Sequence, residues 1–227
     1  MTGYSLKGVV TALLLVALLM LYLHTSNATD YQKLSNLAMQ RYGEHAKASI
    51  LELQATINEL RDAPEIEKLK KINDFFNSKI KFFDEDINTW GKEDYWATPL
   101  ESIGRERGDC EDYSIAKYIF LRELGISNDK LKLTYVRAQI GGPYSKIFQA
   151  HMILSYYPEP SSEPLILDNL ISDVRQASRR RDLTPIYSFN SEGLWVGNAS
   201  KGDSTSHLSR WRDLLARIKS DGIDITQ

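Results

Sequence analysis

The spacing of apolar residues changes once along this chain, and that change limits the folds it can adopt. Up to about residue 124, apolar residues recur every three or four positions, for example at Ile50, Leu53 and Ile57, which is typical of helices with one buried face. From residue 131 they alternate with polar residues, as in the run LKLTY over residues 131–135, which is typical of strands. Helices first and strands second predict an α+β fold with an antiparallel sheet.

The expected elements follow from these periods and from the residues that end them. Helical structure is predicted over residues 30–61, followed by a helix that starts at Pro64 and ends near Phe83. A third helix is predicted to begin at Cys110 and to end at Gly125, because glycine readily adopts the left-handed conformation that closes helices. Residues 84–107 have no sustained period and are expected to form an aromatic-rich loop. Further predictions are strands over 131–135, 151–157, 165–167, 186–189 and 194–196, and a last helix around Trp211.

The first residues are expected to direct the chain out of the cytoplasm. Residues 8–23 form an uncharged apolar run, preceded by Lys7 and followed by small and polar residues up to Ala28. The run is shorter than the ~20 residues of a comfortable membrane-spanning helix and longer than a minimal signal-peptide core. We therefore expect residues 1–28 to be a signal peptide or an N-terminal membrane anchor, and residues 29–227 to form one domain outside the cytoplasm.

Charge and cysteine content exclude several classes of function. The chain has 28 basic and 30 acidic residues, so it lacks the positive charge typical of nucleic-acid-binding proteins. Its one cysteine, Cys110, rules out an intrachain disulfide and a cysteine-rich metal site. A lone thiol in an exported protein is exposed to oxidation, so a functional reason for keeping it is expected.

The position of Cys110 suggests a nucleophile. A helix N-terminus stabilises a thiolate through its unpaired N–H groups and its dipole. His151 opens the second expected strand and Asp168 follows the third, so antiparallel pairing of these strands would bring the two side chains to the same edge of the sheet. Such a cysteine, histidine and aspartate could act together in catalysis. From the residues alone, a packed structural cysteine remains the alternative.

Short sequence runs around these residues resemble a known family. They are DYWATP at residues 94–99, GDCEDY at 108–113, His151, and LDNL at 167–170. These runs resemble the bacterial transglutaminase-like cysteine proteinases of the LapG type, over roughly residues 66–170. The resemblance implies a papain-like or transglutaminase-like core with Cys110, His151 and Asp168 as catalytic residues.

The same resemblance implies a substrate, an inhibitor and a cellular location. It implies a periplasmic, calcium-dependent endopeptidase that cleaves the N-terminal region of a large surface adhesin and so releases a biofilm. It also implies an inhibitor, the periplasmic domain of an inner-membrane receptor for cyclic di-GMP. The domain itself would be exported to the periplasm or anchored to the inner membrane.

Calcium is also suggested by charge around the thiol. Asp109, Glu111 and Asp112 surround a sulfur that must ionise to act, and like charges raise the pKa of a thiol. A hard cation such as Ca²⁺ would offset those charges through oxygen ligands. The resemblance adds Asn128 as a further ligand. The alternative is that acidic residues in a first helical turn only complement the helix dipole.

Other assignments stay open at this point. The Cys110 backbone N–H is expected to stabilise the oxyanion, and Trp96 is expected either to assist it and line the substrate groove or to pack in the core. Two rival functions keep some of the same features: a transglutaminase with the same triad, and a non-catalytic calcium-binding interaction module. The region after Ile171 carries no readable motif. Its Arg179, Arg180 and Arg181 are expected to be solvated, with contact to an acidic partner or to anionic lipid as the alternative.

Overall fold

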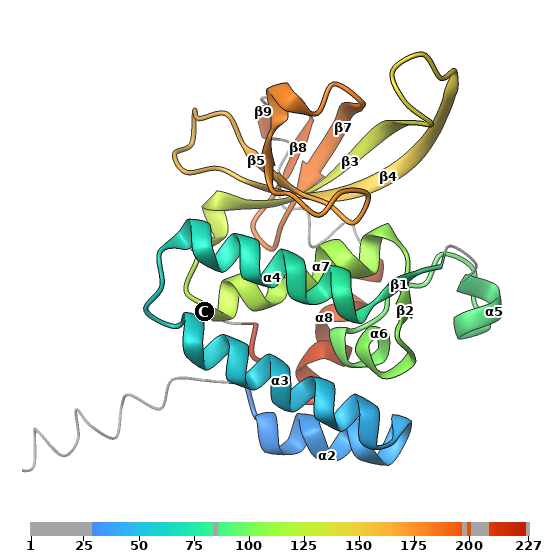
Figure 1. Cartoon of the computed structure of the whole chain (residues 1–227), viewed down its shortest axis with the longest axis vertical. Coiled ribbons are helices and arrows are strands. Elements are labelled where there is room, and N and C mark those ends of the chain that lie inside the picture. The colour runs from blue at the N-terminus through green and yellow to red at the C-terminus, as the bar shows by residue number, and fades with distance from the viewer. Residues whose placement is uncertain (1–28, 84–85, 197–198, 201–208, 226–227) are drawn as a thin grey trace, which may run out of the picture.

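Helices cover one face of an antiparallel sheet, as the sequence predicted. The computed structural model describes residues 29–83, 86–196, 199–200 and 209–225. Its seven-stranded sheet has the order β6-β5-β4-β3-β7-β8-β9, and the helices pack together on one side of it (Figure 1). The α+β class and the antiparallel sheet are thus confirmed.

The helical layer comes mainly from the first half of the chain. It contains α2 (Tyr31–Tyr42), α3 (Glu44–Leu60), α4 (Glu65–Lys79), α5 (Asp86–Trp90), α6 (Pro99–Arg105) and α7 (Cys110–Glu123), with α8 (Ser209–Asp221) added at the end. The helical stretch expected over residues 30–61 is two helices, because Gly43 at φ 92° takes a conformation that interrupts the helix. The segment expected to be an aromatic loop contains the short helices α5 and α6, and Thr98 starts α6 with a capping box that includes Glu101.

The sheet comes from the second half. Its strands are β3 (Leu131–Ile140), β4 (Ile147–Tyr156), β5 (Leu165–Leu167), β6 (Arg175–Gln176), β7 (Leu183–Phe189), β8 (Leu194–Val196) and β9 (Ala199–Ser200). Two short 3-10 helices, η1 (Asn128–Lys130) and η2 (Ala177–Arg179), precede β3 and β7. The strands β1 (Lys81–Phe82) and β2 (Arg107–Gly108) form a separate parallel pair beside α6. The hairpin of β3 and β4 is longer than the sequence predicted, and its tip projects from the body of the protein (Figure 1).

Side chains along β3 and β4 point alternately to the two faces of the sheet. Leu131 and Leu133 of β3 and Met152 and Leu154 of β4 are buried against the helices. Val136, Ala138, Ile153 and Ile166 form a smaller apolar cluster on the opposite face. The core between sheet and helices therefore holds α7 against β4, which sets the position of the residue that begins α7.

No helix in the described ranges is both long and apolar enough to cross a membrane. The leader expected at residues 1–28 lies outside those ranges.

Candidate active site

The first residue of α7 is the cysteine. Asp109 caps the helix, and its side chain accepts hydrogen bonds from the backbone N–H groups of Glu111 and Asp112. The Asp112 side chain accepts in return from the Asp109 N–H, which completes a capping box. This cap fixes the helix start, so Cys110 is held at the N-terminus of a 14-residue helix.

The thiol of Cys110 is half-buried and has two close partners. It donates to Glu111 Oε2 at 2.8 Å, and it lies against the backbone N–H of Met152 on β4. Burial raises the pKa of the thiol above its ordinary value, the charge and hydrogen bond of Glu111 and the charge of Asp109 raise it further, and the Met152 N–H lowers it. In this arrangement the sulfur is protonated.

His151 and Asp168 form a buried pair. The Nε2 atom of His151 lies 2.7 Å from Asp168 Oδ1, which leaves Nδ1 of the imidazole for another partner. The Leu170 N–H donates to the same carboxylate oxygen at 3.1 Å. Burial tends to raise the pKa of Asp168, but His151, followed by Arg180 and the Leu170 N–H, lowers it to about 2. Asp168 is therefore a charged carboxylate that fixes the imidazole.

The backbone of Met152 joins the two parts of the site. Its N–H lies at the Cys110 sulfur, and its C=O accepts from Ser114 Oγ one turn further along α7, at 3.0 Å. Met152 directly follows His151 on β4. The structure therefore brings the N-terminus of α7 to the strand position beside His151, and the three residues expected to be catalytic lie in one region.

Arg180 belongs to this region although the sequence analysis expected it to be solvated. Its guanidinium is buried and donates to Asp168 Oδ2 at 2.7 Å and to Asp182 Oδ2 at 2.8 Å. The neighbouring Arg179 and Arg181 are exposed, as expected. No sequence signal separates the middle arginine of such a run from the others, because its burial depends on how η2 folds back towards β5.

The three carboxylates expected to bind calcium lie together, and Asp86 joins them. Burial raises the pKa of Asp109 to about 10, with the charges of Asp112, Glu111 and Asp86 adding to the shift. Burial also raises the pKa of Asp112, whose Oδ1 accepts from the Ala97 N–H at 2.7 Å. Asp86 is held by the Tyr95 N–H at 2.6 Å. Asp86 was not predicted from the sequence, where its one signal is its place in a segment of a length that is usually functional.

The acidic residues suit a calcium ion by chemistry. Within the described residues, no three or more histidine, cysteine, aspartate or glutamate side chains are arranged to hold a metal ion as they stand. The donors are nevertheless all carboxylate oxygens, which Ca²⁺ prefers, and the charges of Asp86 and Glu111 raise the pKa of both Asp109 and Asp112. A divalent cation would offset that repulsion.

Asn128, which was expected to complete the calcium site, forms hydrogen bonds to residues outside the acidic group. Its Oδ1 accepts from the Tyr118 hydroxyl at 2.5 Å, and its backbone C=O accepts from Asn190 Nδ2 at 2.9 Å. Tyr118 is eight residues beyond Cys110 on α7, which corresponds to about 12 Å along the helix. The buried carboxamide of Asn128 thus connects η1 to α7 and to the end of β7.

Trp96 packs in the core. Its ring stacks on Phe189 with centroids 5.9 Å apart and meets Trp211 edge to face at 6.4 Å. Its indole N–H is buried and has no hydrogen-bond partner among the described residues. The ring of Trp96 therefore packs in the core, one residue before the Ala97 N–H that holds Asp112, and a role of its indole N–H at the oxyanion stays a prediction.

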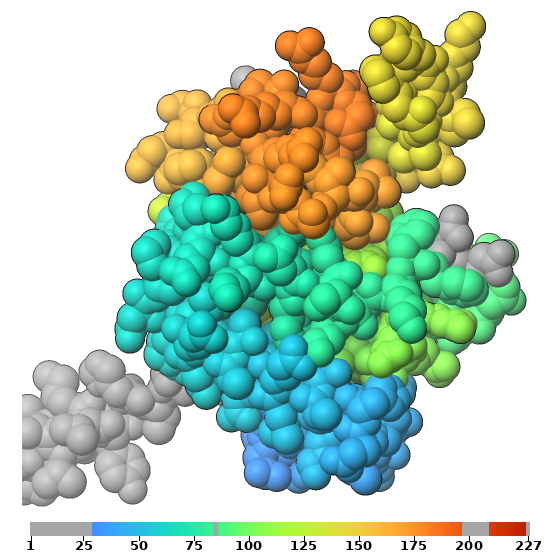
Figure 2. Space-filling model, viewed as in Figure 1, coloured from blue at the N-terminus to red at the C-terminus, as the bar shows by residue number. Residues whose placement is uncertain are grey.

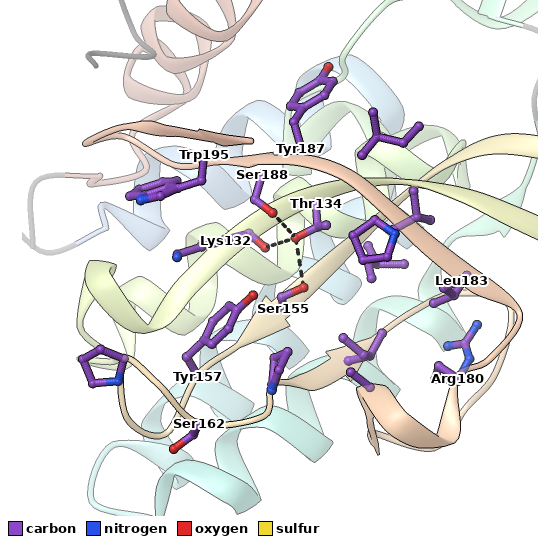
Figure 3. Close-up of a pocket in the computed structure, with 18 of the residues that line it drawn as sticks. Lys132, Thr134, Ser155, Tyr157, Ser162, Arg180, Leu183, Tyr187, Ser188 and Trp195 are labelled. Carbon is purple, nitrogen blue, oxygen red and sulfur yellow. Dashed lines mark hydrogen bonds between the residues drawn. The ribbon is translucent and has the colours of Figure 1, made fainter. Parts of the chain in front are cut away.

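A pocket of 820 Å³ lies on the sheet face away from the helices (Figure 3). At its base Thr134 lies 2.9 Å from Ser155 Oγ and 3.0 Å from Ser188 Oγ. Arg180 lines one end of the pocket, and neither Cys110 nor His151 is among its lining residues. The pocket therefore adjoins the support of Asp168 and is separate from the thiol.

Comparisons with known proteins agree with this geometry. The sequence pattern of the family described as bacterial transglutaminase-like cysteine proteinase, BTLCP, matches residues 39–196. The solved structure of Legionella pneumophila LapG is 39% identical, covers 84% of this chain and 97% of its own, and superposes with a TM-score of 0.71. Its EGTA-treated form is also 39% identical, covers 84% and 98%, and gives 0.72. Its calcium-bound form is 39% identical, covers 83% and 98%, and gives 0.70. No curated protein matches.

Proposed function

The chain belongs to the bacterial transglutaminase-like cysteine proteinases and is a cysteine protease, and on that premise we propose that it is a periplasmic, calcium-dependent endopeptidase with a triad of Cys110, His151 and Asp168. The proposal is carried by the backbone of Met152. Its N–H lies at the Cys110 sulfur, and the residue directly before it is His151, which forms a buried pair with Asp168. A thiol and an imidazole supported by a carboxylate are the parts that thiol proteases need.

The proposed mechanism uses these three side chains. His151 accepts the thiol proton, and the Cys110 sulfur attacks the carbonyl carbon of the scissile peptide bond. His151 then returns that proton to the leaving amine as the C–N bond breaks, which leaves a thioester on Cys110. Water, deprotonated by His151, hydrolyses the thioester and regenerates the thiol. Asp168 holds the imidazole through Nε2, so the other nitrogen serves both proton transfers.

The carboxylates near the thiol must be neutralised for this chemistry. Asp109, Glu111 and Asp112 would hold a calcium ion with help from Asp86, and the bound ion would supply positive charge beside the thiol. Glu111 is the critical residue, because its carboxylate accepts a hydrogen bond from the thiol at 2.8 Å and so holds the proton on the sulfur. With the charges of Glu111 and Asp109 offset, Cys110 loses its proton to His151 more readily.

The substrate and partners are proposed from family membership and from the leader. The substrate is the N-terminal region of a large surface adhesin, and its cleavage releases the cell from a biofilm. The periplasmic domain of an inner-membrane receptor that responds to cyclic di-GMP would bind the enzyme and restrain it. The apolar run at residues 8–23 supports export to the periplasm, with or without retention in the inner membrane.

One cleavage experiment tests the activity and the metal together. The purified protein is incubated with the N-terminal region of an adhesin encoded in the same genome, in calcium, in EGTA, and in EGTA followed by excess calcium. We expect cleavage that EGTA stops and calcium restores, and none by Cys110→Ala. Cleavage that continues in EGTA would refute the calcium dependence, and incorporation of a primary amine without chain cleavage would identify a transglutaminase instead.

A further inference from the structure

One edge of β4 is unpaired beside the thiol. Along its whole length β4 pairs with β3, from Ile147 opposite Ile140 to Tyr156 opposite Leu131. On its other side it pairs with β5 only from Leu154 to Tyr156. Residues 147–152 therefore have no strand partner on the β5 side within the described residues, and this stretch ends at the active site.

The direction of the backbone groups identifies which residues face that edge. The Tyr157 N–H donates to Lys130 O at 2.8 Å, on the β3 side, so backbone groups of odd-numbered residues point towards β3. The backbone groups of even-numbered residues point away from β3, towards the β5 side. Met152 follows this rule, because its N–H and C=O meet Cys110 and Ser114 of α7.

Phe148 and Ala150 share that orientation. The residue opposite Phe148, Gln139, sends its own N–H to Asp182 O at 2.8 Å instead of to β4. Residues 147–150 are all exposed, and Figure 2 shows the hairpin that carries them as a lobe standing clear of the rest of the surface. Two sets of backbone donors and acceptors, spaced two residues apart, are thus available on the same edge as the reactive sulfur.

We propose that an extended segment of the protein substrate adds to this edge as an extra strand, pairing with Phe148 and Ala150 and reaching Cys110 at the position of Met152. This deepens the proposed function and depends on it. Edge pairing gives affinity through main-chain bonds, while side-chain pockets give specificity. A long exposed edge is otherwise a hazard that proteins block with proline, charge or a covering segment. Residues 147–150, Ile-Phe-Gln-Ala, contain no charge and no proline.

The structure also suggests which side chains would accompany the substrate. Ile147 is 60% exposed and Phe148 is 45% exposed, and both lie on the unpaired stretch. An extended substrate strand would bury apolar surface there in addition to forming main-chain bonds. The expected substrate segment is therefore unfolded or loosely folded, able to become extended, and apolar at alternate positions.

The test compares two substitutions at one residue. Phe148→Pro removes an N–H that faces the open edge and no bond to β3, whereas Phe148→Ala keeps that N–H and removes only the ring. We expect kcat/KM for adhesin cleavage to fall about 10-fold further in Phe148→Pro than in Phe148→Ala, the size of one lost hydrogen bond. Alkylation of Cys110 by iodoacetamide should proceed at the wild-type rate in both, because that reagent needs no strand pairing.

A second measurement needs no enzyme variant. Peptides that span the mapped cleavage site are N-methylated at one residue at a time and offered to the wild-type enzyme. Strand addition predicts that methylation impairs cleavage at every second residue on one side of the scissile bond.

Equal sensitivity to methylation at all positions, or equal activity of Phe148→Pro and Phe148→Ala with normal folds, would overturn the proposal. Dimerisation of the free enzyme that Phe148→Pro abolishes would overturn it too, by showing that a second copy occupies the edge. No cleavage of any substrate by the wild type would instead refute the proposed function.

Discussion

Arg180→Met should destabilise the protein by disrupting the support of Asp168. The side chains of Arg180 and Asp168 are 3% and 0% exposed and their atoms lie 2.7 Å apart. Removing one partner of a buried ion pair typically costs 3–5 kcal/mol, because the other charge stays buried. His151 and the Leu170 N–H still hold Asp168, and methionine fills much of the volume, so we expect about 3 kcal/mol.

Two further variants separate this ion pair from a general packing effect. The other acidic partner of Arg180, Asp182, is 38% exposed, so Asp182→Asn should cost at most about 1 kcal/mol. The double variant Arg180→Met with Asp168→Asn should be more stable than the two single losses predict, because it leaves no unpaired buried charge.

Urea unfolding followed by tryptophan fluorescence measures the wild type, the double variant and the single variants Arg180→Met, Asp168→Asn and Asp182→Asn. The expected result is a lower midpoint for Arg180→Met with an unchanged slope. Equal losses in Arg180→Met and Asp182→Asn, or strictly additive effects in the double variant, would refute the view that Arg180 acts by stabilising the charge of Asp168.

Three other predictions concern a buried amine, the acidic residues and a close contact. Burial lowers the pKa of Lys117 to about 7, so between pH 7 and 10.5 the unfolded chain binds more protons than the folded protein, and stability should rise with pH. Lys117→Met should therefore be more stable than the wild type by up to about 5 kcal/mol near pH 7. Urea titrations should show this difference closing by pH 10. Asp109→Asn should weaken calcium binding at least 10-fold by calorimetry, and Asn128→Ala should leave it unchanged. A larger loss of calcium affinity in Asn128→Ala than in Asp109→Asn would instead identify Asn128 as a ligand. Gly104→Ala should lower stability by about 1–3 kcal/mol in thermal unfolding, because an added Cβ would overlap the Tyr42 ring; an unchanged midpoint would show that the ring moves aside freely.

Much of the fold was predictable because the deciding interactions are local. The start of α7 depends on its capping residue, and its end depends on Gly125, which has φ 82°. The strands predicted at residues 165–167 and 194–196 are β5 and β8. The break at Gly43 was not predicted, because a single glycine within a helical period does not by itself show whether the chain turns.

The parts of the site that strand order brings together were predictable from the sequence. The parts that depend on other tertiary contacts were not. His151 and Asp168 were expected to meet across neighbouring antiparallel strands, and they do, although β4 begins four residues before His151. Arg180 and Asp86 depend on how η2 and the region around α5 fold back on the domain, which no local pattern encodes. Asn128 was assigned by resemblance alone, and its burial against Tyr118 became visible only in three dimensions.

The account depends most on the claim that His151 takes the proton of Cys110, and the rate of alkylation measures this directly. The protein in calcium is treated with iodoacetamide across pH 5–9, and the rate at Cys110 is followed by intact mass for the wild type and for His151→Ala. The account predicts rapid reaction near neutral pH in the wild type and a profile displaced to higher pH in His151→Ala. Identical profiles in the two proteins would contradict it.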